Sequence, residues 1–257
     1  MEVPKFNVIR DAKKNNINCL IIPVINEGEK FHSLLKNIYS EKITEQCDLI
    51  ISDGGSEDNT IEISGPMNII QLKDKEGLSA QLRAAYFQAK EKGYKNIITI
   101  DGNGKDDPIY VRDILKKLNE GYDFVQCSRF LKEGKGVNTP KLREIAIRFI
   151  HAPVLSTFSG FKWTDTTQGY RGYSSRFLFD ERISIFRNIF KKYELLAYLS
   201  YIAPRKNFKC IEVPVIRRYP KGKIPTKINS LSGNSDVLLT LLRACFGGFN
   251  AKNEDKF

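Results

Sequence analysis

Residues 96–108 read NIITIDGNGKDDP, and this segment sets the fold class of the chain. Its first five residues are mostly β-branched and apolar, a composition that predicts a buried strand. The strand ends at Asp101, and the polar turn that follows contains Asn103 and two further aspartates. Apolar residues at helical spacing begin after Pro108. A buried strand, a polar turn and a helix in this order are typical of an α/β protein with a parallel sheet.

The same order of strand, turn and helix recurs along the first half of the chain. Further strands are predicted at 19–25, 47–52, 67–72 and 122–128. Helices are predicted at 29–42, 78–93 and 108–121. Five strands in about 110 residues predict one open, mostly parallel central sheet that is flanked by helices.

The second half of the chain has a less regular pattern. Its predicted elements are a Gly- and Lys-rich loop at 129–138, a helix at 139–158, a turn and short strand at 164–173, a helix at 182–203, a strand at 209–219, a basic loop at 220–229 and an apolar helix at 235–249. Pro140 fits the first turn of its helix, whereas Pro153 is expected to kink the same helix.

Polar residues follow several of the predicted strands. In open parallel sheets, ligands bind beyond the carboxyl ends of the strands. Asp101 and Asn103 offer oxygen ligands there, and Mg²⁺ is usually held by one or two carboxylates together with the phosphates of a substrate. The segment 53–60 (DGGSEDNT) forms a second such turn. Both segments can equally be ordinary turns or helix caps, because Asp, Asn, Ser and Gly favour these positions.

The two halves of the chain differ in charge. Residues 1–128 contain 17 basic and 20 acidic side chains, whereas residues 129–257 contain 24 basic and 10 acidic side chains. This excess predicts an anionic partner: nucleic acid, an anionic lipid surface or a polyphosphate ligand. Nucleic acid is disfavoured, because the aromatic residues do not cluster with Lys and Arg and no known nucleic-acid motif is present.

The composition also limits the class of protein and its compartment. With 41% hydrophobic and 28% charged residues, the chain is expected to fold as a globular protein. Its five cysteines contain no C-x-x-C pair, which favours buried thiols in a reducing compartment. No signal peptide and no apolar run of about 20 residues is found, so a cytoplasmic location is predicted. The helix at 235–249 is either a core or oligomer helix or an interfacial anchor, which would place the protein peripherally at the inner face of the membrane.

Seven segments resemble family 2 glycosyltransferases in order and spacing, in particular the branch of dolichyl- and polyprenyl-phosphate mannose and glucose synthases. They are CLIIPVINEG (19–28), DLIISDGGSEDNT (48–60), KEGLSAQLRAA (75–85), ITIDGNGKDDP (98–108), QCSRF (126–130), TDTTQGYRGY (164–173) and IRRYPKGKIPTKI (216–228). The resemblance covers residues 18 to about 230. It implies a GT-A (Rossmann-like) fold, a nucleotide-diphosphate sugar donor, Mg²⁺ or Mn²⁺ as cofactor, and inversion at the anomeric carbon.

The resemblance also implies roles for the residues that match the family's motifs. On the donor side these are Pro23, Asn26 and Glu27 around the nucleoside, Asp53 on the base, Asp101 and Asn103 on the metal and diphosphate, and Arg218 and Lys227 in a basic loop that closes over the diphosphate. On the acceptor side they are Arg129, Arg143 and Asp165. The chain then divides into a nucleotide-sugar-binding half (1–128), an acceptor-side half with the basic loop (129–230), and an apolar helix and tail (231–257).

The proposed chemistry depends on the acceptor. Breaking the bond between sugar and phosphate develops negative charge on the departing nucleoside diphosphate, which a metal and nearby cations stabilise. A polyprenyl phosphate acceptor is already anionic and needs no strong base. A hydroxyl acceptor requires a carboxylate to accept its proton, and Asp165 is the candidate, although it can also be a structural turn cap.

Two alternatives to transfer onto polyprenyl phosphate stay open. The same chemistry can act on a hydroxyl of a surface glycan or a lipid-linked acceptor. The chain can also be a catalytically weak protein that binds nucleotide sugars, because Asn103 stands where the family usually has a second aspartate and Lys105 lies in the same turn. The oligomeric state is not predicted.

Overall fold

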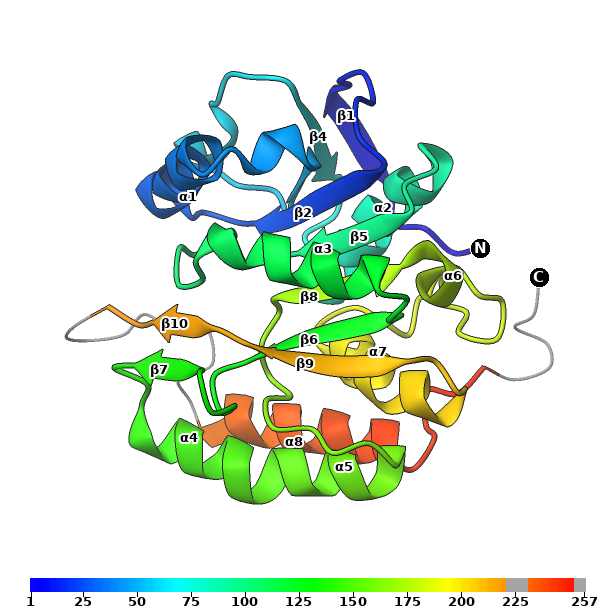
Figure 1. Cartoon of the computed structure of the whole chain (residues 1–257). Coiled ribbons are helices and arrows are strands. Elements are labelled where there is room, and N and C mark those ends of the chain that lie inside the picture. The colour runs from blue at the N-terminus through cyan, green and yellow to red at the C-terminus, as the bar shows by residue number, and fades with distance from the viewer. Residues whose placement is uncertain (221–230, 252–257) are drawn as a thin grey trace.

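The computed structural model describes residues 1–220 and 231–251, which form one layered α/β structure (Figure 1). An eight-stranded sheet lies at its centre, with the strand order β1-β4-β3-β2-β5-β8-β6-β9, and β10 and β7 pair separately. The strands are β1 (Phe6–Arg10), β2 (Asn18–Val24), β3 (Asp48–Asp53), β4 (Met67–Leu72), β5 (Asn96–Thr99), β6 (Phe124–Ser128), β7 (Lys135–Val137), β8 (Arg171–Ser174), β9 (Cys210–Pro214) and β10 (Ile216–Arg218).

The main sheet is mostly parallel, as predicted. The strands β4, β3, β2 and β5 pair in parallel, and β6 pairs in parallel with β9. Two strands run in the opposite direction: β1 at one edge, and β8 between β5 and β6. All five strands predicted in the first half are present, whereas β1 has no counterpart among the predictions.

Helices cover both faces of the main sheet. They are α1 (Gly28–Ser40), α2 (Leu78–Glu91), α3 (Val111–Asn119), α4 (Lys141–Ala146), α5 (Ala152–Ser159), α6 (Ser175–Leu178), α7 (Glu194–Arg205) and α8 (Leu231–Cys245), with short 3-10 helices at Ile43–Glu45, Asn59–Ile61 and Pro108–Tyr110. Side chains of α1 and α3 pack into one apolar core, and those of α2, α7 and α8 pack into the other. The sheet separates the two cores, so its central strands β2, β3 and β5 are buried on both faces, whereas the edge strand β1 is largely exposed.

Four predicted elements of the second half need correction. The loop predicted at 129–138 contains the short strand β7, which pairs with β10. The helix predicted at 182–203 begins only at Glu194, although the apolar side chains before Glu194 are buried at helix-like spacing. The left-handed backbone of Ser184 (φ 51°) interrupts a helix at that residue, and 185–193 are irregular. The strand predicted at 209–219 divides into β9 and β10, which belong to different sheets. The helix predicted at 139–158 contains a π-helical turn, Ile147–His151, just before Pro153.

The loops at the carboxyl ends of β3, β2 and β5 lie side by side. The backbone N–H of Gly54 donates to the carbonyl of Val24 at 2.9 Å, and that of Gly102 donates to Pro23 at 3.4 Å. The turn after β3 and the segment after β5 are therefore both attached to the end of β2. Within residues 1–220 and 231–251, no helix combines the length and apolarity that crossing a bilayer requires.

Candidate active site

The loops after β2 and β3 are joined by hydrogen bonds. The side-chain oxygen of Asn26 accepts from the N–H of Glu57 at 2.8 Å, and the N–H of Glu27 donates to Thr60 Oγ1 at 2.9 Å. Asn26 is exposed and has a left-handed backbone (φ 51°), whereas Pro23 is buried. These contacts fix the shape of the rim where the nucleoside was predicted to bind.

Asp53 is the buried centre of the turn after β3. Its side chain has no exposed surface, and it accepts from the N–H groups of Gly55 and Ser56 at 3.0–3.2 Å and from Gln71 Nε2 at 2.8 Å. The carboxylate is thus occupied by partners within the protein. Its visible role is to organise the turn, and the predicted hydrogen bond to a base stays a prediction.

Asp101 and Asn103 lie in the turn after β5, where a metal was predicted. The side chain of Asp101 is 21% exposed, and the Oδ1 of Asn103 accepts from the N–H of Lys105 at 3.2 Å. The carboxylate and amide oxygens of these two residues are hard ligands, of the kind that Mg²⁺ or Mn²⁺ takes together with substrate phosphates. Among the described residues no cluster of three His, Cys, Asp or Glu side chains could hold a metal by itself. Asp101 and Asn103 therefore fit a metal ion whose remaining ligands are supplied by the phosphates of a substrate.

The segment before β8 passes directly over Asp101. Thr99 Oγ1 donates to the carbonyl of Gly169 at 2.7 Å, which fixes this approach. A Cβ atom at position 169 would lie 3.2 Å from Cγ of Asp101 and still closer to its Oδ1. Only glycine leaves room for the carboxylate at this position.

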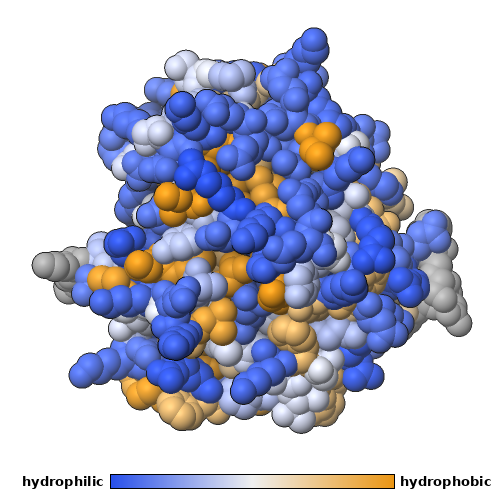
Figure 2. Space-filling view, in the orientation of Figure 1, coloured by the Kyte–Doolittle hydropathy of each residue, from blue (hydrophilic) through white to orange (hydrophobic). Residues whose placement is uncertain are grey.

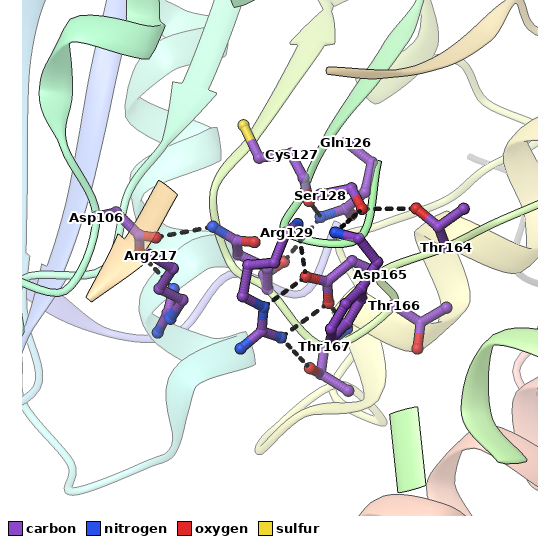
Figure 3. Close-up of polar contacts among 12 residues, drawn as sticks. Asp106, Gln126, Cys127, Ser128, Arg129, Thr164, Asp165, Thr166, Thr167 and Arg217 are labelled. Atoms are coloured by element: carbon purple, nitrogen blue, oxygen red, sulfur yellow. Dashed lines mark hydrogen bonds and ion pairs between the residues drawn. The ribbon is translucent and has the colours of Figure 1, made fainter. Parts of the chain in front are cut away.

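The basic residue that reaches Asp101 is Arg217. Its Nη2 lies 3.0 Å from Oδ2 of Asp101. Its Nη1 forms an ion pair with the buried Asp106 (Figure 3). Asp106 also accepts from Gln168 Nε2 at 2.7 Å. Burial alone would lower the pKa of Arg217, but the carboxylates of Asp106 and Asp101 outweigh it and raise that pKa. The neighbouring Arg218 is 58% exposed and lies 3.9 Å from Asp107.

A second buried ion pair joins Arg129 to Asp165, both predicted on the acceptor side. Arg129 donates from Nε to Oδ2 of Asp165 at 2.7 Å and from Nη2 to Oδ1 at 3.0 Å (Figure 3). The two side chains are 1% and 0% exposed. The third nitrogen of Arg129, Nη1, donates to the hydroxyl of Tyr219 at 2.7 Å. Burial opposes the charge of Arg129, but Asp165 prevails and raises the pKa of Arg129.

Tyr219 connects the two ion pairs. Its hydroxyl accepts from Arg129, and its ring lies 5.4 Å from Nζ of Lys105 and 5.7 Å from the guanidinium of Arg217. Burial alone would raise the pKa of Tyr219, but the surrounding arginines lower it, and Arg143 is near enough to contribute. Burial and then Arg217 lower the pKa of Lys105. Arg143 and Lys105 are partly exposed, so these cations are accessible to solvent.

Glu212 supports the loop that carries Asp165. Its carboxylate accepts from the N–H and the hydroxyl of Thr164 at 2.8–2.9 Å and from the N–H of Asp165 at 3.0 Å. Burial raises the pKa of Glu212 to about 7, against an ordinary value of 4.5. Glu212 thus binds the backbone of this loop, and Arg129 binds its Asp165 side chain.

The structure therefore gathers Asp101, Arg129, Arg143 and Asp165 around one site, and it adds Arg217 to them. The predicted contact of Arg218 with the diphosphate stays a prediction. Lys227 lies outside the described residues.

The site places cations near a carboxylate at the carboxyl ends of parallel strands in an α/β fold. The fold is GT-A, because the crystal structure of glucosyl-3-phosphoglycerate synthase from Mycobacterium tuberculosis in complex with Mn²⁺, UDP and phosphoglyceric acid is similar. That similarity has a TM-score of 0.66 at 16% identity and covers 89% of this chain and 78% of the other. The predicted fold class is confirmed.

The family model for glycosyl transferase family 2 matches residues 19–194, so the chain belongs to this family. It is 25% identical to the polyprenol monophosphomannose synthase of Mycolicibacterium smegmatis over 76% of this chain and 75% of the relative. It is also 25% identical to the undecaprenyl-phosphate mannosyltransferase of Micrococcus luteus, over 76% of this chain and 81% of the relative. The protein is a hexosyltransferase of the predicted branch.

Proposed function

We propose that the enzyme transfers a hexose from a nucleotide-diphosphate sugar to a polyprenyl phosphate, with inversion at the anomeric carbon. The choice of acceptor rests on the burial of Asp165 and on its ion pair with Arg129. A hydroxyl acceptor needs a base within reach, but this carboxylate has no exposed surface and both of its oxygens accept from Arg129. A phosphate acceptor has no such need.

The cations beside Asp101 suit two anionic substrates. Arg143 and Lys105 are accessible and can bind phosphate oxygens, whereas the buried Arg129 positions Tyr219 and the Asp165 loop. In the reaction, an oxygen of the acceptor phosphate bonds to the anomeric carbon while the bond to the diphosphate breaks. The electron pair leaves with the nucleoside diphosphate, and attack from the opposite face inverts the carbon.

Asp101 and Asn103 are the residues that would hold Mg²⁺ or Mn²⁺. When bound, the metal supplies positive charge that stabilises the departing diphosphate. The Mn²⁺ and UDP in the complex of glucosyl-3-phosphoglycerate synthase support this assignment, although the similarity to that protein is one of fold.

An exposed apolar surface supports a lipid acceptor and peripheral contact with a membrane. Leu142, Ile145 and Phe149 are 83%, 52% and 70% exposed, and their spacing places them on one side of the helical segment from α4 to α5. Leu239 and Phe246 of the adjoining α8 region are also exposed. Apolar atoms gather along this lower edge of the molecule in Figure 2.

A cleft lies along the helical segment from α4 to α5. It has a volume of about 430 Å³ and includes Arg148, Pro153 and Trp163 in its lining. Phe130 and Thr164, the chain neighbours of Arg129 and Asp165, also line it. The cleft suits the first isoprene units of a lipid whose phosphate lies near Arg143, and Arg148 adds positive charge at its rim.

The test compares acceptors that differ only in the phosphate. Purified enzyme is incubated with Mn²⁺, radiolabelled GDP-mannose or UDP-glucose, and either a short-chain polyprenyl phosphate or the polyprenol of the same length. We expect labelled lipid only with the phosphate, and NMR of the product should show the opposite anomeric configuration to the donor. The names of the relatives make mannose the first sugar to test. Equal transfer to the polyprenol, or retained configuration, would reject the proposal.

A further inference from the structure

We propose that Arg217 is the resident counter-ion of Asp101, so that a divalent cation enters the site together with the donor's diphosphate and not before it. This inference rests on the proposed function, because that function supplies the diphosphate. Arg217 thereby becomes a positioning residue that sets the order of binding.

The contacts of Arg217 leave one end of its guanidinium free to change partner. Its Nη1 pairs with the buried Asp106, and its Nη2 lies 3.0 Å from Oδ2 of the partly exposed Asp101. Its Nε is buried and has no hydrogen-bond partner among the described residues. A buried N–H without a partner is costly unless a ligand can satisfy it. Phosphate oxygens beside Asp101 could satisfy both Nε and Nη2.

The backbone holds Arg217 at this place. Arg217 forms an isolated β-bridge with Asp106, and the N–H of Arg218 donates to the carbonyl of Lys105 at 2.9 Å. On the other side, β10 pairs with β7 through Arg217 and Gly136. The guanidinium can therefore turn, but it cannot leave the neighbourhood of Asp101.

The charges of the site favour joint entry. The carboxylates of Asp101 and Asp106 are balanced by Arg217 and Lys105, and Arg143 adds one positive charge nearby. A free divalent cation would thus enter surroundings without net negative charge, next to a guanidinium that repels it. A nucleotide-diphosphate sugar carries about two negative charges, so its complex with the cation is close to neutral.

The test measures Mn²⁺ binding without nucleotide, by the loss of the free Mn²⁺ signal in electron paramagnetic resonance. Replacing Arg217 alone would leave Asp106 buried without its partner and endanger the fold. The informative variant is therefore Arg217→Met combined with Asp106→Asn, which removes one charge of each sign. An asparagine at this position still offers an oxygen to Gln168.

We expect the double variant to bind free Mn²⁺ at least tenfold more tightly than the wild type. In the wild type, UDP or GDP should raise Mn²⁺ affinity at least tenfold, and in the double variant this gain should shrink. The control is Arg218→Met, which removes the same charge one residue along from an exposed side chain and should leave free Mn²⁺ affinity within twofold.

Equal Mn²⁺ affinity of the wild type and the folded double variant would overturn the inference. The inference would also be overturned if Arg218→Met raised the affinity for free Mn²⁺ as much as the double variant does. Folding of the variants is checked by circular dichroism and urea unfolding. If the wild type binds neither UDP nor GDP in the presence of Mn²⁺, the proposed function is rejected instead. The comparison of free Mn²⁺ affinities does not depend on that result.

Discussion

Replacing Gly169 with alanine is expected to disable the site while the fold survives. The new Cβ would lie 3.2 Å from Cγ of Asp101 and closer still to its Oδ1, and the nearest atoms all belong to this one carboxylate. The carboxylate must therefore turn away from its present position. Because displacing a catalytic group by about 1 Å can cost about 100-fold in rate, we expect kcat/KM to fall by about that factor.

The expected effect on stability is small. The overlap involves the end of a side chain that is 21% exposed, so the free energy of unfolding should fall by about 1 kcal/mol or less. Steady-state transfer to polyprenyl phosphate gives kcat/KM, and urea unfolding gives the stability of the same preparation.

Gly121→Ala is the matched control, because it should lower stability and leave transfer unchanged. Gly121 lies between α3 and β6, at the edge of the sheet away from the site, and a Cβ there meets no atom within 4 Å. Its φ of 92° is unfavourable for alanine, which should cost about 1–2 kcal/mol of stability and leave kcat/KM unchanged. Near-normal kcat/KM in Gly169→Ala would refute the view that the position of the Asp101 carboxylate matters for transfer.

Three further predictions concern the buried charges and the apolar surface. Burial raises the pKa of Glu212 to about 7 from 4.5, so the folded state holds this proton more tightly, and the free energy of unfolding falls as the pH rises from about 4.5 to about 7. At about 1.4 kcal/mol per pKa unit the loss reaches about 3.5 kcal/mol, and Glu212→Gln should lack it in urea titrations; parallel pH profiles would contradict this. Asp165→Asn removes the partner of buried Arg129 and should lower the free energy of unfolding by about 3 kcal/mol, whereas a change within experimental error would mean that the pair is not needed. Phe149→Ser should weaken flotation with anionic vesicles several-fold, while Ile17→Ser, which alters an exposed apolar residue directly before β2, should not; equal loss would argue against a membrane surface at α4 and α5.

The strand ends of the first half were predictable because local pattern and topology agree there. A run of apolar residues that stops at Asp101 can be recognised from the local sequence alone. Parallel strands then place their carboxyl ends at the same edge of the sheet. The turn of Asp53 and the turn of Asp101 accordingly both contact the end of β2. The side-chain partners of Asp53 were not predictable, because Gln71 reaches it from the neighbouring strand β4.

Local pattern was insufficient where distant contacts decide the structure. The insertion of β8 between β5 and β6 depends on pairing Arg171 with Thr99, which are 72 positions apart in the chain. The segment 182–193 has buried apolar residues at helix-like spacing, and its irregular path depends on what it packs against and on the left-handed Ser184. Periodicity reports which residues are buried, but it does not distinguish a helix from a buried loop.

The two arginines of β10 show what strand geometry adds to the family motif. Side chains alternate along an extended segment, and Val213 and Val215 are 3% and 1% exposed. The same alternation continues past the break between β9 and β10, so that Arg217 and Tyr219 are 6% and 4% exposed while Arg218 faces solvent. Motif spacing alone selected Arg218. Alternation from the valines would have selected Arg217, and a buried arginine requires carboxylate partners, which Asp101 and Asp106 provide.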